Sequence, residues 1–237
     1  MPIPCYFETL TRFGLQELKQ GGVQAHNGNW AVTPDGDFQF GNTRVNALFR
    51  LVERWRVNQP TLEQLYWDLL SRAERLKEVM KARAQGLGPS WCREPVQYHE
   101  ETEALGDYES GASVYAGAIL VVLNNLLQRC RQDLHASEAQ WVSAAPKIEG
   151  YSVGVVFEAA AANFHHHDEW ARAVKIDDRQ RASMEPLCAV LGRDLWTQGR
   201  PTLRANVCRE VLLKISDGST DRLYRLMFEF AKALAVP

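Results

Sequence analysis

Apolar residues recur at steps of three and four along most of the chain after residue 42, which is the spacing of amphipathic helices. The first such stripe runs from Val45 to Met80, and Asn42 or Thr43 is placed to cap its first helix. Pro60 lies inside the stripe, and we expect it to end one helix or to begin the next. The pattern therefore predicts a helical hairpin over residues 42 to 85.

Residues 85 to 106 break the period, because glycines, prolines and a run of glutamates interrupt the apolar positions. We expect a loop or domain junction there. Beyond it, periodic stretches predict helices over residues 108 to 133, 152 to 173, 180 to 191, 203 to 215 and 221 to 234, with Asp221 as a helix N-cap and a connector at 143 to 150. Small residues between Gly111 and Ala118 would let a neighbouring helix approach closely. Residues 107 to 237 are thus predicted to form the main helical bundle.

Residues 1 to 41 have a different pattern. Two short apolar runs, 30 to 32 and 38 to 40, flank a turn sequence at residues 34 to 37, which is typical of a β-hairpin. The predicted fold is therefore mainly α: a helical bundle, with residues 42 to 85 packed on it and a small N-terminal β-hairpin as an appendage.

Composition supports a globular chain of 237 residues, 46% hydrophobic and 24% charged. A formal net charge of -2 means that nucleic-acid binding would need a local basic patch. The apolar runs are interrupted before the roughly 18 residues of a membrane span, and the N-terminus lacks a signal-peptide pattern, so we expect a cytoplasmic protein with no membrane partner. Five scattered cysteines without a CxxC pair argue against a disulfide framework and a cysteine zinc site.

A polar cluster interrupts the apolar helix predicted for residues 152 to 173. Half of the six histidines occupy residues 165 to 167. Residues four apart share a helix face, so Asn163 neighbours His167 and His165 neighbours Glu169. Core packing alone does not account for this segment.

Two chemistries suit that surface. A metal could bind His165 and Glu169, with Asp168 or His99 as a third ligand, although the spacing matches no recognised motif. Alternatively, His167 could transfer a proton during metal-independent RNA cleavage, with Asn163 as its orienting group or phosphate contact. His165 and Glu169 would then be secondary participants. We assign no cofactor.

The segment Tyr108-Glu109-Ser110-Gly111-Ala112-Ser113-Val114-Tyr115-Ala116 continuing to Asn124-Asn125, followed by Asn163-x-x-x-His167, resembles the HEPN superfamily of small helical-bundle proteins. The resemblance implies an up-and-down helical bundle, frequent homodimers and, in active members, RNA cleavage by an Arg-x4-6-His motif, often Arg-Asn-x-x-x-His. Here Ala162 stands where that motif has arginine. A second match to the looser spacing is Arg129-x5-His135.

Three functional hypotheses follow. The first is a HEPN-like protein that binds or cleaves RNA without metal in a prokaryotic toxin or defence setting. Its partners would be RNA, a second copy of the chain, and an antitoxin or another defence component. The second is a non-catalytic helical protein-interaction module. The third is a protein that binds a metal through histidine and carboxylate groups.

Overall fold

The computed structural model describes residues 3 to 20, 25, 26, 28 to 33, 36, 38 to 90, 92 to 173, 175 to 197 and 200 to 236. The fold is mainly α, with 72% of the chain helical and eight α-helices over the described residues. The strands form only two-stranded antiparallel pairs in this part of the chain. The predicted fold class is confirmed.

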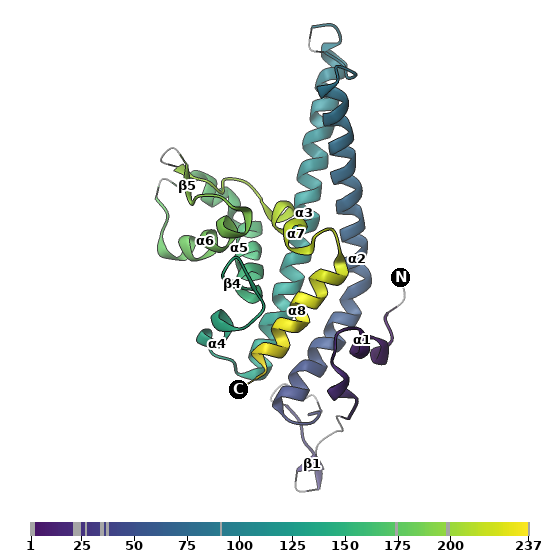
Figure 1. Cartoon of the computed structure of the whole chain (residues 1–237), viewed down its shortest axis with the longest axis vertical. Helices are drawn as coiled ribbons and strands as arrows, with labels where there is room; N and C mark the ends of the chain where they lie inside the picture. The colour runs from purple at the N-terminus through teal and green to yellow at the C-terminus, as the bar shows by residue number, and fades with distance from the viewer. Residues whose placement is uncertain are drawn as a thin grey trace.

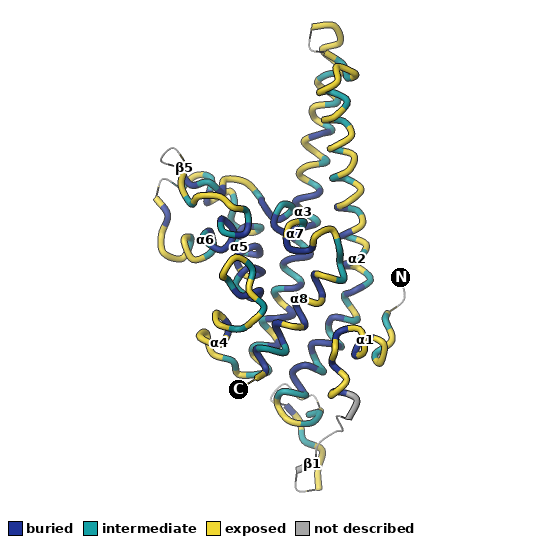
Figure 2. Tube along the Cα trace, viewed as in Figure 1, coloured by how far each residue is buried: buried dark blue, intermediate teal, exposed yellow. Residues whose placement is uncertain are grey.

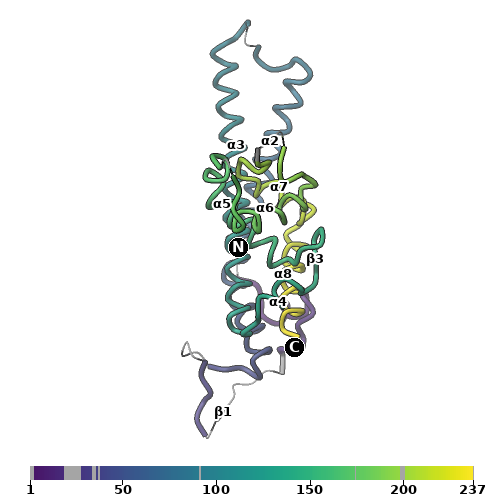
Figure 3. Tube along the Cα trace, turned by 90° about the vertical axis from the view of Figure 1, so that its left-hand side faces the viewer, coloured from purple at the N-terminus to yellow at the C-terminus, as the bar shows by residue number. Residues whose placement is uncertain are grey.

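Two long helices, α2 (Thr43–Ala84) and α3 (Pro95–Leu134), pack antiparallel along their length and form the axis of the molecule (Figure 1). Asn42 caps α2 as expected, because its side chain accepts a hydrogen bond from the backbone N–H of Val45 at 3.0 Å. The shorter helices pack around one half of this hairpin, and the other half projects beyond them in both views (Figures 1 and 3).

The remaining elements fall into an N-terminal and a C-terminal group. The N-terminal group contains α1 (Tyr6–Arg12), η1 (Gln16–Gln20), β1 (Ala25–His26) and β2 (Asn29–Trp30). The C-terminal group contains α4 (Glu138–Ser143), β3 (Lys147–Ile148), β4 (Tyr151–Ser152), α5 (Val153–Arg172), α6 (Asp178–Leu191), β5 (Trp196–Thr197), β6 (Arg200–Pro201), α7 (Cys208–Ser216) and α8 (Thr220–Leu234). Helices α5, α7 and α8 contact α3, and α6 packs on α5.

The core lies in the half of the hairpin that the other helices cover. Leu69 on α2 and Leu105 on α3 are the outermost buried positions, and no described residue between 70 and 104 is buried (Figure 2). We call residues 70 to 104 the distal hairpin. Burial therefore divides the hairpin into a buried base and an exposed tip.

Pro60 does not break α2, so the predicted hairpin within residues 42 to 85 is wrong. A proline inside a helix removes one backbone hydrogen bond and costs roughly 3 kcal/mol. Burial on both sides of it, at Trp55, Leu62 and Tyr66, opposes that cost and keeps the helix continuous. The true hairpin pairs α2 with α3.

The predicted junction at residues 85 to 106 is also wrong, because α3 begins at Pro95 and only residues 85 to 94 join the helices. Pro95 occupies the first turn, where its missing N–H costs nothing. Across the hairpin, Nε of Arg83 donates a hydrogen bond to the carboxylate of Glu101 at 2.9 Å, which forms an ion pair. The expected domain boundary at residue 107 thus falls inside a continuous helix.

At the N-terminus, Val32 and Phe38 form an antiparallel bridge, and the N–H of Gln39 donates to the carbonyl of Ala31 at 2.9 Å. This agrees with pairing of the two apolar runs. Residues 34, 35 and 37 of the expected turn lie outside the described residues. The short helix α1 was not predicted.

Two details of the C-terminal half differ from expectation. Ser219, and not Asp221, caps α8, since its side chain accepts from the N–H of Arg222 at 3.4 Å. The connector at 143 to 150 starts at the last residue of the unpredicted α4 and contains β3, which pairs with β4 just beyond it. The expected close approach of helices is confirmed at Gly117, where an added Cβ would overlap the ring of Phe164 on α5.

One helix among the described residues, α3, is long and apolar enough to cross a membrane by length and composition. This corrects the expectation that no stretch qualifies, which considered only uninterrupted apolar runs. Half of its most apolar window is buried within the protein, as in the core helix of a soluble protein.

Candidate functional site

Asn163 lies on α5 with no exposed surface. Its side-chain oxygen accepts a hydrogen bond from the N–H of Val207 at 2.9 Å, and its side-chain amide donates to the carbonyl of Ala205 at 3.3 Å. Asn163 thereby ties α5 to the segment that leads into α7. A side chain buried in this way has no surface with which to contact a phosphate.

His167 follows one turn later, and its ring nitrogen Nδ1 lies 3.3 Å from the carbonyl oxygen of Phe164 on the same helix. Its side chain is 31% exposed, and Nε2 lies 3.6 Å from Asp168. Within the described chain, Asp168 is the only charged group at ion-pair distance from this ring. The structure does not pair Asn163 with His167, and no arginine side chain among the described residues hydrogen-bonds to the imidazole.

The remaining predicted residues of this segment do not complete a site. His165 is exposed and contacts the rings of Phe164 and His166. Glu169 pairs with His166 at 3.2 Å and not with His165, the neighbour expected from helical spacing. No three histidine, cysteine, aspartate or glutamate side chains come together as a metal site over the described residues. The metal hypothesis gains no support.

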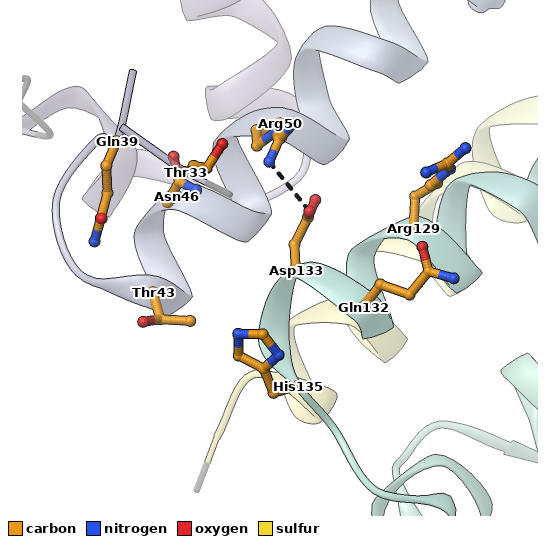
Figure 4. Close-up of a pocket in the computed structure, with 9 residues that line it drawn as sticks. All are labelled: Thr33, Gln39, Thr43, Asn46, Arg50, Arg129, Gln132, Asp133 and His135. Atoms are coloured by element: carbon orange, nitrogen blue, oxygen red, sulfur yellow. Dashed lines mark hydrogen bonds and ion pairs between the residues drawn. The ribbon is translucent and has the colours of Figure 1, made fainter. Parts of the chain in front are cut away.

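The second predicted pair, Arg129 and His135, lies at the C-terminal end of α3 and not on α5. Arg129 lies in the last two turns of α3, and His135 is its C-cap residue in the left-handed conformation at φ 54°. Both side chains line a cavity of about 260 Å³ at the base of the hairpin (Figure 4). The other lining residues come from α2, α3 and the N-terminal segment: Thr33, Gln39, Thr43, Asn46, Arg50, Gln132 and Asp133. We call this the basal cavity.

Charge in the basal cavity is arranged around one carboxylate. Asp133 accepts from Arg50 at 3.2 Å and from Arg54 at 2.7 Å, and its side chain is largely buried. Arg129 is exposed and has no ion pair or hydrogen bond to another described residue. It is therefore the guanidinium available to an anionic ligand at this cavity.

The cavity holds no activated thiol. Cys130 lies next to Arg129 in sequence but is fully buried. Burial, with a smaller contribution from Asp133, raises the pKa of Cys130 to about 12, although Arg54 acts to lower it. Because the thiolate is the nucleophilic form, Cys130 is inert at neutral pH.

Arg129 and His135 project from separate places on α3, with Gln132 between them in Figure 4. The basal cavity is slightly smaller than the roughly 300 to 1,000 Å³ of sites that hold whole small molecules. It offers guanidinium, amide, hydroxyl and imidazole groups. These features suit a small anionic group that is part of a larger ligand, such as a phosphate.

The sequence indicated Arg129 and His135 as candidate site residues, but it did not indicate that Arg50, Thr43 and Gln132 would line the same cavity. Arg50 and Asp133 are 83 residues apart in sequence. Only the antiparallel pairing of α2 with α3 brings them together, so no local spacing could reveal the cavity.

Comparison with models of protein families, with curated proteins and with solved structures found no match. The resemblance to the HEPN superfamily stays a prediction that rests on the residues quoted for it.

Proposed function

We propose that this protein binds RNA at the basal cavity, with Arg129 and His135 as phosphate contacts. The observation that carries the proposal is that these two residues, the alternative Arg-x5-His pair, line one cavity at the base of the hairpin. A cytoplasmic location, and the homodimer and the toxin or defence setting that the HEPN resemblance implies, belong to the same proposal.

Phosphate binding needs a cation that is free to change partners. Arg129 meets this condition because it is exposed and forms no bond to another described side chain. Guanidinium groups bind phosphate through two parallel N–H donors, and the Gln132 amide can donate beside them. The net charge of -2 gives no general attraction for RNA, so the local cation must supply it.

The separation of Arg129 from His135 favours binding over cleavage. In-line attack by a 2′-hydroxyl needs the proton-transfer group and the cation at the same phosphodiester. In Figure 4 the two side chains do not converge on one point. Contacts to successive phosphates of one strand fit this arrangement better, and we expect bound RNA to remain intact.

The test compares Arg129→Ala with Arg179→Ala. Arg179 on α6 is also exposed and without a bond to another described residue, so the two variants lose the same charge at different places. Binding of a labelled single-stranded RNA is measured by fluorescence anisotropy across a salt series. Arg129→Ala should weaken binding and reduce the slope of log affinity against log salt by about 1, as expected for one lost phosphate contact.

A second variant tests the imidazole. His135→Asn keeps a residue type that tolerates the left-handed conformation and removes the ring. It should weaken binding, whereas His167→Ala should bind as the wild type does. Equal loss in Arg129→Ala and Arg179→Ala, or no RNA binding at all, would overturn the proposal. If the protein cleaves RNA in the presence of EDTA and His167→Ala abolishes that cleavage, the active site lies on α5 and not at the basal cavity.

The distal hairpin supports a second candidate, a protein-interaction module. Its α2 part, residues 70 to 84, carries five basic and two acidic residues, and its α3 part, residues 95 to 104, carries three acidic residues and no lysine or arginine. Two copies related by a two-fold axis would place each basic helix beside an acidic one. Because no described residue between 70 and 104 is buried, this surface is open to a second copy.

Shortening the hairpin tests that candidate. Arg72 lies against Gly111 and Arg83 bonds to Glu101, so residues 80 and 104 face each other across the hairpin. Replacing residues 80 to 104 with a short glycine-containing turn keeps Leu69 and Leu105. The shortened chain should unfold at the same temperature but sediment as a monomer where the full chain is a dimer. Equal sedimentation of both chains would rule this candidate out.

A further inference from the structure

A second cavity of about 360 Å³ adjoins the basal cavity, and Arg50 lines both. Its lining residues combine three phenylalanines with charged side chains of α2: Phe38, Phe40, Phe49, Arg50, Glu53 and Arg54. We call it the aromatic cavity. Neither the metal hypothesis nor the phosphate contacts explain it.

The rings of this cavity are not part of the main core. Phe40 and Phe49 have ring centroids 4.3 Å apart at an interplanar angle of 31°, and both are only partly buried. Phe38 is 54% exposed. None of the three belongs to the main core or to the partly buried residues packed against it.

A further exposed ring extends this surface. Trp30 on β2 is 64% exposed, and its ring meets the edge of Phe38 with centroids 6.3 Å apart. Exposing aromatic surface has a free-energy cost in water, and contiguous exposed apolar groups mark binding surfaces. The N-terminal segment therefore presents rings to solvent directly beside the basal cavity.

We infer that the aromatic cavity is a nucleobase-binding subsite, in which an unpaired base stacks on Phe38 and Phe40 while its strand continues into the basal cavity. The inference rests on the proposed RNA binding and specifies its ligand as single-stranded. Stacking on aromatic side chains requires bases that are splayed out of a helix, because the faces of paired bases are covered by their neighbours.

Three features favour a nucleic acid over an apolar peptide. The phenylalanines share their cavity with Arg50 and Arg54, whose guanidinium planes also stack on bases. The Arg54 guanidinium is held in place by Asp133 at 2.7 Å, which orders it before a ligand arrives. The adjoining cavity presents polar groups and Arg129, which match a sugar-phosphate chain and not a hydrophobic side chain.

The experiment uses three probes of equal length: single-stranded oligo(U), an abasic oligonucleotide with the same phosphates, and a blunt RNA duplex. Each is titrated against the full chain by fluorescence anisotropy. Oligo(U) should bind tightest, because only it offers both bases and accessible phosphates. The abasic probe should bind through the basal cavity alone.

Phe38→Ala should weaken oligo(U) binding by roughly 5- to 150-fold, which corresponds to the range measured for one base stacked on a ring. The same variant should leave binding of the abasic probe unchanged. Phe38→Tyr should retain most of the oligo(U) affinity, because it keeps the ring. Trp67→Ala removes a similarly exposed ring from α2, outside the aromatic cavity, and serves as the matched control.

The outcomes separate the two proposals. If the abasic probe and oligo(U) bind equally tightly, or if Phe38→Ala changes nothing, the base subsite is overturned while RNA binding stands. If no probe binds, or if binding is indifferent to Arg129→Ala, the proposed function itself fails. Thermal unfolding by circular dichroism checks that each variant is folded. Preferential binding of the duplex would also overturn the subsite.

Discussion

The backbone N–H of Val207 donates to the side-chain oxygen of Asn163 at 2.9 Å, joining positions 44 residues apart in sequence. The bond anchors the start of α7 to the middle of α5, and the carbonyl of Ala205 accepts from the other end of the same side chain. A residue that suggested catalysis by its spacing from His167 therefore has a structural role.

The first prediction concerns this anchor. Asn163→Leu leaves the N–H of the buried residue Val207 without its partner, and an unsatisfied buried group costs about 1 to 3 kcal/mol, whereas Ala205 is exposed and its carbonyl can bind water instead. Urea denaturation followed by tryptophan fluorescence should show a free energy of unfolding lowered by at least that amount. His167→Ala should change it by less than about 0.5 kcal/mol, because the ring is partly exposed. Full stability in Asn163→Leu would contradict the structural role.

Packing of α3 against α5 provides the second prediction. Gly117→Ala would place a methyl group inside the ring of Phe164, so we expect a loss of about 1 to 3 kcal/mol in unfolding free energy. Gly106→Ala is the matched control on the same helix, since nothing lies within 4 Å of its added Cβ. That change should stabilise the protein by about 0.5 to 1 kcal/mol through helix propensity. Equal effects at the two glycines would show that the helices are not in close contact.

The third prediction concerns the five cysteines. Burial raises the pKa of Cys130 and of Cys208 to about 12, and it also raises the pKa of Cys188. Cys5 and Cys92 are exposed. In a thiol assay with a disulfide reagent at pH 8, two thiols of the folded protein should react quickly, and all five should react in denaturant. Fast reaction of a third thiol in the native state would contradict the burial of α3, α6 or α7.

Asp221 provides a prediction about pH. Partial burial acts to raise the pKa of Asp221, but hydrogen bonds from Arg225 and Arg12, at 2.6 and 2.8 Å, outweigh it and lower the pKa below its usual value of 3.8. A lowered pKa in the folded state means that the contribution to stability is complete above the unfolded value and is lost as pH falls through the folded value.

Asp221→Asn should therefore be less stable than the wild type at pH 7, by no more than about 1 kcal/mol because the pair is partly exposed. The difference should begin to shrink as the pH falls below about 4, the value of an unfolded aspartate, and should approach zero once the pH is below the lowered pKa of Asp221 in the folded protein. Thermal unfolding of both proteins across a pH series measures this difference in stability. A difference that is unchanged at pH 2 would show that charge is not its source.

Much of the helical architecture could be predicted from local sequence. The apolar period located α5, α6 and α8 to within a few residues of their observed bounds, and Asn42 was recognisable as a cap from its place before the first stripe. Small residues on α3 also indicated the close approach that Gly117 makes to Phe164. These features depend on neighbours within one or two turns, which periodicity and side-chain size describe directly.

Tertiary packing decided the rest. Pro60 and the glutamates of residues 100 to 103 suggest breaks when only their own sequence is considered, but α2 and α3 remain helical because each packs along the other. The same pairing brings Arg50 to Asp133 and forms the cavity that Arg129 and His135 line. The sequence by itself determined which segments are helical and which residues have suitable chemistry. Which of those residues meet was decided only by the fold, because contacts across a helical hairpin join positions whose separation in sequence has no fixed period.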